Sequence, residues 1–336
     1  MIQITNAMMY NNINNELLNE SNSVYNLQDE ISSGLQIMSP QDNPGGMVNV
    51  LSYNNSTALV TQYNSNVSIA ANIGSLASST ITNAMNVVNQ ANSLAVEMAN
   101  GTNTPANNQA AAQQVGQMIN ELTQYADTSY NGQNLFTGNN LNLTSAYTAV
   151  SHKITGLIGI PSSSSLSYNV YTYAGTDTSQ NYQITQNETV TPTLTADAIF
   201  GNDPVPSSTS SATVPSGLIS VLSLFQSELQ KNVYQQNSSS IIQGIQNGLS
   251  TMTAAQATIG TVTERLNEQQ TSYQTVLTNI SQLLSQTQDV NVAQAMTHLT
   301  QAQAAYQATL EASSNITSLT PTLTAEAFIF SFLIIS

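Results

Sequence analysis

Apolar residues near both ends of the chain recur at alternating intervals of three and four, the spacing of a coiled-coil seam. In the first stretch the a and d positions are Tyr10, Ile13, Leu17, Glu20, Val24, Leu27 and Ile31. In the second stretch the same register runs from Ile241 to Val290 and includes Val276, Ile280 and Leu283. Such seams are buried only against another helix. We therefore expect helical chain ends that lie together and pack against copies or neighbouring proteins.

The first helix is predicted to run from about Met8 to Ser33, because Gly34 suits the left-handed conformation after a helix C-terminus. Residues 35–46, LQIMSPQDNPGG, contain two prolines and paired glycines, which predict an irregular connector. Helical spacing returns from about Met47 to Met98, and a further amphipathic segment covers 111–125. A last helix is predicted from a stripe that consists of Val292, Met296, Leu299, Tyr306 and Leu310.

The middle of the chain has a different pattern. The segment YNGQNLFTGNN, which begins at Tyr130, predicts a turn that leads into a hairpin. Over 141–215, β-branched and aromatic residues alternate with polar ones, as in LSYNVYTY, and this predicts a separate, strand-rich insert. The order of helices, strands and helices predicts a mainly α fold. It would contain a long coiled-coil bundle formed by both chain ends, a β hairpin and an inserted β-rich domain.

These patterns divide the chain into five predicted regions. Residues 1–45 form the N-terminal coiled-coil helix and connector, and 46–140 form the N-terminal part of a helical bundle with the hairpin. Residues 141–215 form the β-rich insert, and 216–290 form the C-terminal part of the bundle. Residues 291–336 form a C-terminal coiled-coil helix and an apolar tail. Strands and helices do not alternate, which argues against a doubly wound enzyme fold.

Charged residues are scarce and mostly acidic. They make up 6% of the 336 residues, against about 25% in an average domain, and the net charge is −15. Nucleic acid is not an expected partner, because phosphate binding needs patches of Lys and Arg. A chain with three bases gains little positive charge when its carboxylates are protonated, which favours a protein that faces acidic water. The alternative is compositional drift in an Asn- and Ser-rich genome.

The sequence offers little catalytic chemistry. It has no cysteine, so disulfides and thiolate metal sites are excluded. His152 and His298 lie in different regions without Cys, Asp or Glu at ligand spacing, and no phosphate-binding loop or nucleophile elbow is present. We therefore expect no catalytic, cofactor-binding or metal site, and we interpret His298 as a surface or groove residue.

The two termini carry information about targeting. The N-terminal segment MIQITNAMMYNN lacks the basic and apolar regions of a secretory signal peptide. No apolar run approaches the roughly 20 residues that span a bilayer, so we expect no membrane insertion. The tail is apolar from Phe328 to Ile335, and we expect Pro321 to interrupt the helix before it. Two interpretations of the tail stay open: a plug that inserts among neighbouring subunits, or an accidental extension such as a reading-frame change.

Four motifs occur in the same order as in a known family. The segment SSGLQIMSPQDNP resembles a stretch of hook-associated protein 3, the junction-protein family of bacterial flagella within the flagellin superfamily. The residues that carry this resemblance are Gly34, Pro40, Asp42 and Pro44. YNGQNLFTG, with its ending at Phe136 and Gly138, resembles the hairpin of the same family.

The resemblance continues towards the C-terminus. YAGTDTSQNYQI followed by AIFG is similar to the family's second domain, and LSQTQDVNVAQAM is similar to the C-terminal helix shared by the whole superfamily. The chain departs from the family at Asn291, where an acidic residue is usual. It also departs at Gly45 and Gly46, where alanines are more common.

This resemblance implies a structural protein of the flagellum, not an enzyme, that links the hook to the flagellin filament. Its partners would be copies of itself in a ring of about eleven subunits, the first hook-associated protein, flagellin and a flagellar export chaperone. It would be extracellular, at the hook–filament junction, and exported by the flagellar type III channel without a cleaved signal peptide. A flagellin that forms the filament itself is the near alternative, and a surface hydrolase or adhesin is the distant one.

The expected assembly interface consists of the apolar members of the two seams and of the last stripe. These residues are Tyr10, Ile13, Leu17, Val24, Leu27, Ile31, Val276, Ile280, Leu283, Val292, Met296, Leu299, Tyr306 and Leu310.

The charge balance leads to a first prediction. Assembly brings carboxylates together with almost no bases to pair them, so they repel one another at pH 7 and are mostly neutral at pH 3. We expect light scattering to show tighter assembly near pH 3 than at pH 7. Added salt should restore much of the loss at pH 7 by screening. Assembly that is indifferent to pH, or stronger at pH 7, would contradict the interpretation of the composition as an acid adaptation.

Overall fold

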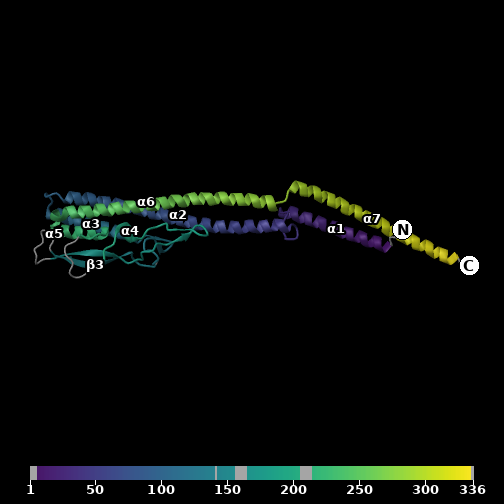
Figure 1. Ribbon diagram of the computed structural model, residues 1–336, viewed down its shortest axis with the longest axis horizontal. Coiled ribbons are helices and arrows are strands. Elements are labelled where there is room, and N and C mark those ends of the chain that lie inside the picture. Colours follow the sequence, from purple (N-terminus) through teal and green to yellow (C-terminus); the bar gives the residue numbers. More distant parts are fainter. Residues whose placement is uncertain (1–5, 141, 156–164, 205–213, 334–336) are drawn as a thin grey trace. The chain divides into compact units, whose positions relative to one another are not determined.

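The computed structural model of the chain describes residues 6–140, 142–155, 165–204 and 214–333, with side chains between residues 8 and 315. It is mainly helical, as predicted (Figure 1). The chain forms two compact units, which we call unit 1 (Met1–Leu59 with Val276–Ser336) and unit 2 (Val60–Thr275). Unit 1 therefore combines the two ends of the chain, whereas unit 2 is one continuous segment.

Unit 1 is built from α1 (Asn6–Ser33), α7 (Val292–Leu333) and the adjoining parts of two long helices, α2 (Pro44–Met98) and α6 (Tyr234–Gln288). Helices α1 and α7 lie side by side (Figure 1). Gly34 ends α1 as predicted, with a φ of +75°. Its carbonyl accepts a hydrogen bond from the N–H of Val290 at 2.9 Å, and Leu35 forms a β-bridge with Asp289. The segment after α1 is thus tied to the segment before α7.

The connector between α1 and α2 is irregular, but α2 begins earlier than we predicted. Its first residue is Pro44, so Gly45 and Gly46 belong to the helix and the predicted boundary between residues 45 and 46 falls inside it. Proline suits the first helical position, where the missing N–H has no partner to lose. The Oδ1 of Asn43 accepts a hydrogen bond from the N–H of Gly46 at 2.9 Å and so caps the helix.

The helical part of unit 2 surrounds one large core. It contains α3 (Pro105–Ala126), α5 (Leu218–Lys231) and the adjoining parts of α2 and α6. The seam that we predicted along α6 is buried at Ile241, Ile245, Met252, Ala255, Ile259, Leu266 and Tyr273. Helix α5 is buried around most of its circumference and packs against α3 and strand β4 (Leu166–Tyr173).

The strands described in unit 2 form three two-stranded antiparallel sheets. The predicted hairpin pairs β1 (Ser129–Tyr130) with β2 (Gln133–Asn134) around Asn131 and Gly132, which both have positive φ. Strand β3 (Tyr147–Ile154) pairs with β4, and β5 (Tyr182–Gln183) pairs with β6 (Thr189–Val190). The short helix α4 (Ala196–Phe200) follows.

The strand-rich segment packs directly on the helices of unit 2. Alternate residues of β4 are buried in the same core as the side chains of α2, α3, α5 and α6. The N–H groups of Asn169 and Tyr171, on the free edge of β4, donate to the Oγ atoms of Ser223 and Ser220 at 2.9 Å. A two-stranded hairpin buries too little surface to be stable alone, so α5 supplies both the apolar contact and the acceptors that close the edge.

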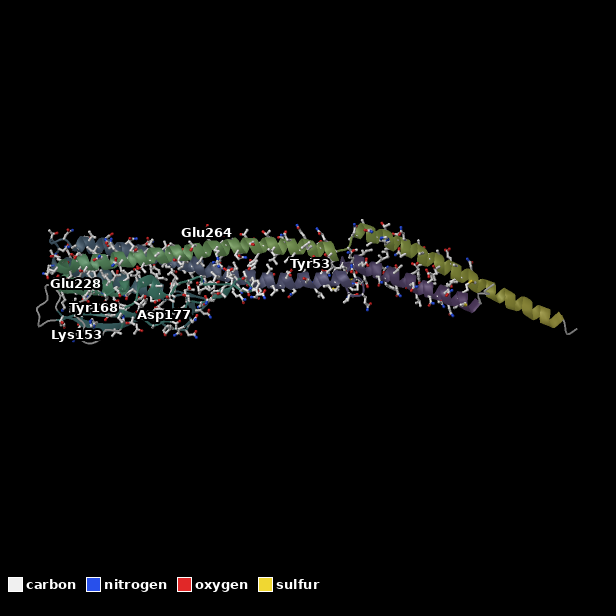
Figure 2. All side chains as sticks on the ribbon, viewed as in Figure 1. Tyr53, Lys153, Tyr168, Asp177, Glu228 and Glu264 are labelled. Carbon is white, nitrogen blue, oxygen red and sulfur yellow. The ribbon has the colours of Figure 1, made fainter. Side chains whose placement is uncertain are left out.

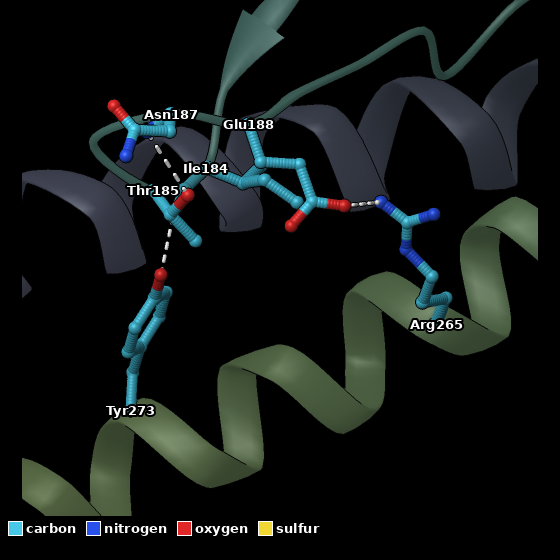
Figure 3. Close-up of polar contacts among 6 residues, drawn as sticks. All are labelled: Ile184, Thr185, Asn187, Glu188, Arg265 and Tyr273. Carbon is cyan, nitrogen blue, oxygen red and sulfur yellow. Dashed lines mark hydrogen bonds and ion pairs between the residues drawn. The ribbon is translucent and has the colours of Figure 1, made fainter.

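The β5–β6 hairpin forms polar contacts with both α2 and α6. The hydroxyl of Tyr273, on α6, donates to the backbone oxygen of Ile184, and Nη2 of Arg265 lies 2.6 Å from Oε1 of Glu188 (Figure 3). On the other side, Nδ2 of Asn66, on α2, donates to a backbone oxygen of β5 at 2.8 Å. The hairpin therefore connects two helices that are far apart in the sequence.

Helix α7 continues to Leu333, past Pro321, where we predicted a break. A proline within a helix removes one N–H donor and disfavours the turn before it, but a helix can continue on either side of such a gap. The apolar run from Phe328 to Ile335 lies outside the described side chains, so both interpretations of the tail stay predictions.

Gly138 provides a test of the hairpin motif. Its φ is +68°, and a Cβ atom at this position would collide with the backbone oxygens of Thr176 and Thr178. We expect Gly138→Ala to lower the free energy of unfolding by about 2 kcal/mol or more, because backbone strain is added to the collision. Gly101→Ala is the control, since Gly101 has open space around it and no positive φ. Urea denaturation, followed by circular dichroism, measures the stability of both variants. Equal stabilities would show that Gly138 is not required for the hairpin motif.

Candidate assembly interface

Exposed apolar side chains are concentrated in unit 1. Among the described residues, all the exposed large apolar side chains lie in unit 1 except Ile69, Val96 and Val214. The buried apolar residues of unit 1, within the same described set, are Ile37, Val50, Ala295 and Ala302, whereas unit 2 has an extensive core. A large exposed apolar surface marks a site of interaction with another molecule. The candidate site of this protein is therefore the surface of unit 1.

Helix α1 packs against α7 through the seam that the sequence predicts. Ile13, Leu17, Val24, Leu27 and Ile31 are half-buried, and they recur at intervals of four, seven, three and four residues. Tyr10, at the start of the predicted seam, is 49% exposed. Because α7 covers these residues only in part, the seam still has apolar surface available for a further partner.

Helix α7 presents two different faces. Ala295 and Ala302 are buried, and Leu299 and Tyr306 between and after them are half-buried, which is again a three–four spacing. The other members of the predicted stripe point away from this contact: Val292, Met296 and Leu310 are 52%, 51% and 42% exposed. The buried side of α7 thus combines small residues with Leu299 and Tyr306, whereas Val292, Met296 and Leu310 remain accessible.

A polar groove of about 700 Å³ lies between α1 and α7. Glu20, Leu27 and Glu30 line it from α1, and His298 lines it from α7. This position agrees with our interpretation of His298 as a groove residue. The groove shows that the two helices do not close tightly on each other over this length.

The α2 and α6 segments of unit 1 are also exposed. Val276 and Leu283 continue the seam of α6 and are 37% and 44% exposed, while Ile280 is half-buried. On α2, Val48 and Leu51 are 66% and 61% exposed. We did not select these two residues from the sequence, although their spacing of three along a helix is the signal that would have found them.

The residues of the turn motifs hold loops in place. The Oδ2 of Asp42 accepts hydrogen bonds from the backbone N–H groups of Ser39 at 2.7 Å and Met38 at 2.9 Å. These bonds, from Ser39 first and then Met38, lower the pKa of the Asp42 carboxyl because they stabilise its charged form. Phe136 is fully buried, and its backbone oxygen accepts a hydrogen bond from the Tyr173 hydroxyl at 3.0 Å. Pro40 is exposed in the connector.

Other kinds of site are not seen in the described part of the chain. No group of three or more His, Asp or Glu side chains there is arranged to hold a metal ion. None of the helices, as far as their residues are described, has the length and apolarity to cross a membrane.

The fold and the exposed chain ends define a class of protein in which two helical termini lie together and leave apolar surface for association. Comparison with protein families supports this classification. The model of the bacterial flagellin N-terminal helical region matches residues 4–141, and the model of the bacterial flagellin C-terminal helical region matches residues 242–323. Together these regions take in well over half of the chain. The chain belongs to the flagellin family.

Several solved structures share the fold. A Vibrio parahaemolyticus protein described as a flagellar hook-associated protein is 14% identical, with a TM-score of 0.59 over 74% of this chain and 100% of that chain. Flagellar hook-associated protein-3 from Legionella pneumophila is 14% identical, with a TM-score of 0.54 over 70% and 97%. FlgL from Xanthomonas campestris is 13% identical, with a TM-score of 0.53 over 69% and 99%. A comparison with curated proteins finds no match.

Leu27 provides a test of the interface. It is half-buried on the seam of α1 and lines the groove, so Leu27→Asp places a carboxylate where assembled helices exclude water. An unpaired buried charge costs several kcal/mol, and we expect this variant to be lost from flagella. The helical circular dichroism of the purified chain should be close to that of wild type, because Leu27 lies outside the core of unit 2.

The matched control is Asn15→Asp, which adds the same charge at an exposed position of the same helix. It should be incorporated normally. Immunoblots of isolated flagella and swimming assays measure the outcome, and wild-type motility of the Leu27→Asp strain would show that this seam is not the interface.

Proposed function

We propose that this chain is a structural component of the bacterial flagellum that joins the hook to the flagellin filament. The observation that carries the proposal is the concentration of exposed apolar side chains on unit 1, which both chain ends form together. Several proteins with the same fold are hook-associated proteins, hook-associated protein-3 among them, and this favours a junction role over other roles within the family.

The accessible surfaces of unit 1 suggest how subunits associate. Half-buried seam residues on α1 and exposed apolar residues on α6 and α7 belong to three helices, which offers surface for more than one neighbour. We propose a ring of about eleven copies, as the resemblance to hook-associated protein 3 implies. Repeated head-to-tail contacts close into a ring when the rotation between neighbours permits it. In this arrangement the first hook-associated protein contacts one side of the ring and flagellin contacts the other.

The same surface requires protection before assembly. Exposed apolar helices aggregate readily, so we propose that a flagellar export chaperone covers unit 1 until the chain leaves by the flagellar type III channel. The protein then acts outside the cell, at the hook–filament junction. The scarcity of bases fits an acidic exterior.

One alternative has support of its own. Both matching family models describe flagellin, so a filament-forming flagellin is the second candidate. The two candidates differ in self-assembly: a flagellin adds to filament seeds and elongates them, whereas a junction protein should form no long filament alone. Electron microscopy of the purified chain with and without seeds distinguishes them.

The decisive experiment is deletion of the gene, followed by electron microscopy of the cell surface. We expect the deletion strain to retain hooks, to lack filaments and to release flagellin into the medium. The wild-type chain supplied in trans should restore filaments, and Leu27→Asp should not. A deletion strain with normal filaments, or a purified chain that forms long filaments by itself, would exclude the junction role.

A further inference from the structure

Glu228 is a fully buried carboxyl group without a partner. It lies on α5 in unit 2, its side chain has no exposed surface, and neither carboxyl oxygen has a hydrogen-bond partner among the described residues. Asp203 is the other buried carboxylate among the described residues, and unlike Glu228 it has hydrogen-bond donors. Its oxygens accept hydrogen bonds from the N–H groups of Ser216 and Gly217 at 2.7 and 3.0 Å. The described part of the fold therefore provides hydrogen bonds to the buried carboxylate of Asp203 and none to that of Glu228.

No positive charge compensates Glu228. Among the described residues the one ion pair joins Arg265 to Glu188, and Lys231, the base on α5, is exposed. The elements that share the core with α5 carry several acids and tyrosines. These are Glu97 on α2, Glu121 and Tyr125 on α3, Tyr168, Tyr171 and Tyr173 on β4, and Tyr234 on α6.

Among these groups, Tyr234 interacts electrostatically with Glu228. Burial raises the pKa of the Tyr234 hydroxyl, and a charge on Glu228 would raise it further. Tyr234 is itself buried, and its hydroxyl donates to the backbone oxygen of Ala95 at 2.8 Å. Its ring lies 4.5 Å from that of Phe225, between centroids. Two aromatic rings thus lie near Glu228 in the fold, and no cation of the described residues forms an ion pair with it.

The same end of α5 holds other polar contacts that depend on close packing. Asn232 ends α5 in the left-handed conformation, and its N–H bonds to the backbone oxygens of Glu228 and Leu229. The Oδ1 of Asn232 accepts a hydrogen bond from Nδ2 of Asn108, at the start of α3, at 2.9 Å. The Oδ1 of Asn108 is buried without a partner. Figure 2 shows Glu228 in unit 2, towards the end that also carries Tyr168 and Lys153.

We propose that Glu228 is an acid-stabilising switch of unit 2: it is carried as an uncharged carboxylic acid in the folded chain, and its ionisation loosens the junction of α5 with α3 and α6. An uncharged carboxyl group can remain in such an environment at modest cost, whereas a bare carboxylate cannot. Ionisation would draw water towards the end of α5 and so weaken the contact between Asn232 and Asn108.

The direction of the pH dependence follows from the burial. Desolvation raises the pKa of the Glu228 carboxyl from 4.5 to about 8. The folded chain then holds this proton more tightly than the unfolded chain does. The stability from Glu228 is fully present below pH 4.5, declines as the pH rises, and is lost above about pH 8. The change in the folding equilibrium constant over this range is on the order of a thousand-fold.

The test is urea denaturation of the full chain between pH 4.5 and 9, followed by circular dichroism. The variant Glu228→Gln keeps the size of the side chain and cannot ionise. We expect its midpoint to change much less with pH than that of wild type, and the difference between the two to grow from pH 4.5 to pH 8. The control is Glu121→Gln, which removes an exposed carboxylate from α3 and should follow the wild-type profile. A Glu228→Gln profile parallel to wild type would overturn the proposal.

A second measurement does not depend on the folding of the variant. In wild-type protein with ¹³C-labelled glutamate carboxyl groups, NMR reports the titration of each carboxyl directly. We expect one resonance to titrate near pH 8 while the chain stays folded, in line with the pKa of Glu228. If every glutamate resonance titrates below pH 6, Glu228 is charged in the folded chain and the proposal fails.

Discussion

The seam of α6 is the interaction on which the rest of the structure depends. From Ile241 to Ile259 its a and d residues are buried or half-buried in the core that they form with α2, α3, α5 and β4. Leu266 and Tyr273, further along the seam, are buried in a second cluster with α2 and the β5–β6 hairpin. The later members of the same seam belong to unit 1, and there Val276 and Leu283 are exposed. One repeating pattern therefore stabilises the fold of a single chain and also provides surface for association. The difference lies in what the chain itself has available to cover each part.

Scarcity of charge shapes the way in which this fold satisfies its polar groups. Hydroxyl and amide side chains cap α2 at Asn43, close the edge of β4 at Ser220 and Ser223, and hold the β5–β6 hairpin at Asn66. Such bonds do not depend on pH in the way that ion pairs do. Among the described residues the single ion pair, Arg265 with Glu188, is half exposed on both sides and contributes little. A structure built in this way can keep its contacts in acid.

An incomplete unit 1 suits a protein that works by association with other chains. A chain that buried both of its ends within itself would have no apolar surface left to drive assembly. The α1–α7 pair keeps its seam half-buried, retains a groove between the helices and leaves Met296 and Leu310 exposed. The exposed apolar surface makes the free subunit prone to aggregation. The proposed chaperone would cover this surface before assembly, and the proposed ring of subunits would cover it afterwards.

The sequence by itself determined the features that depend on local periodicity and backbone conformation. The seams of α1 and α6, the end of α1 at Gly34 and the turn at Asn131 and Gly132 were all predictable, because spacing and positive φ are properties of short segments. The mainly α fold and the family followed from the order of these features. As candidate interface residues, the seam positions of α1 could be selected by spacing alone.

Only the tertiary structure decided which partner each surface meets. In the structure Ala295 and Ala302 are buried, whereas Val292, Met296 and Leu310 are exposed to solvent. The face that a helix buries depends on the neighbour it packs against. The tertiary structure joined the strand-rich segment to the helical core, since α5 offers that hairpin both apolar area and acceptors. It also enclosed Glu228 without a partner. Burial and pairing of this kind arise from residues distant in the chain, and no local pattern encodes them.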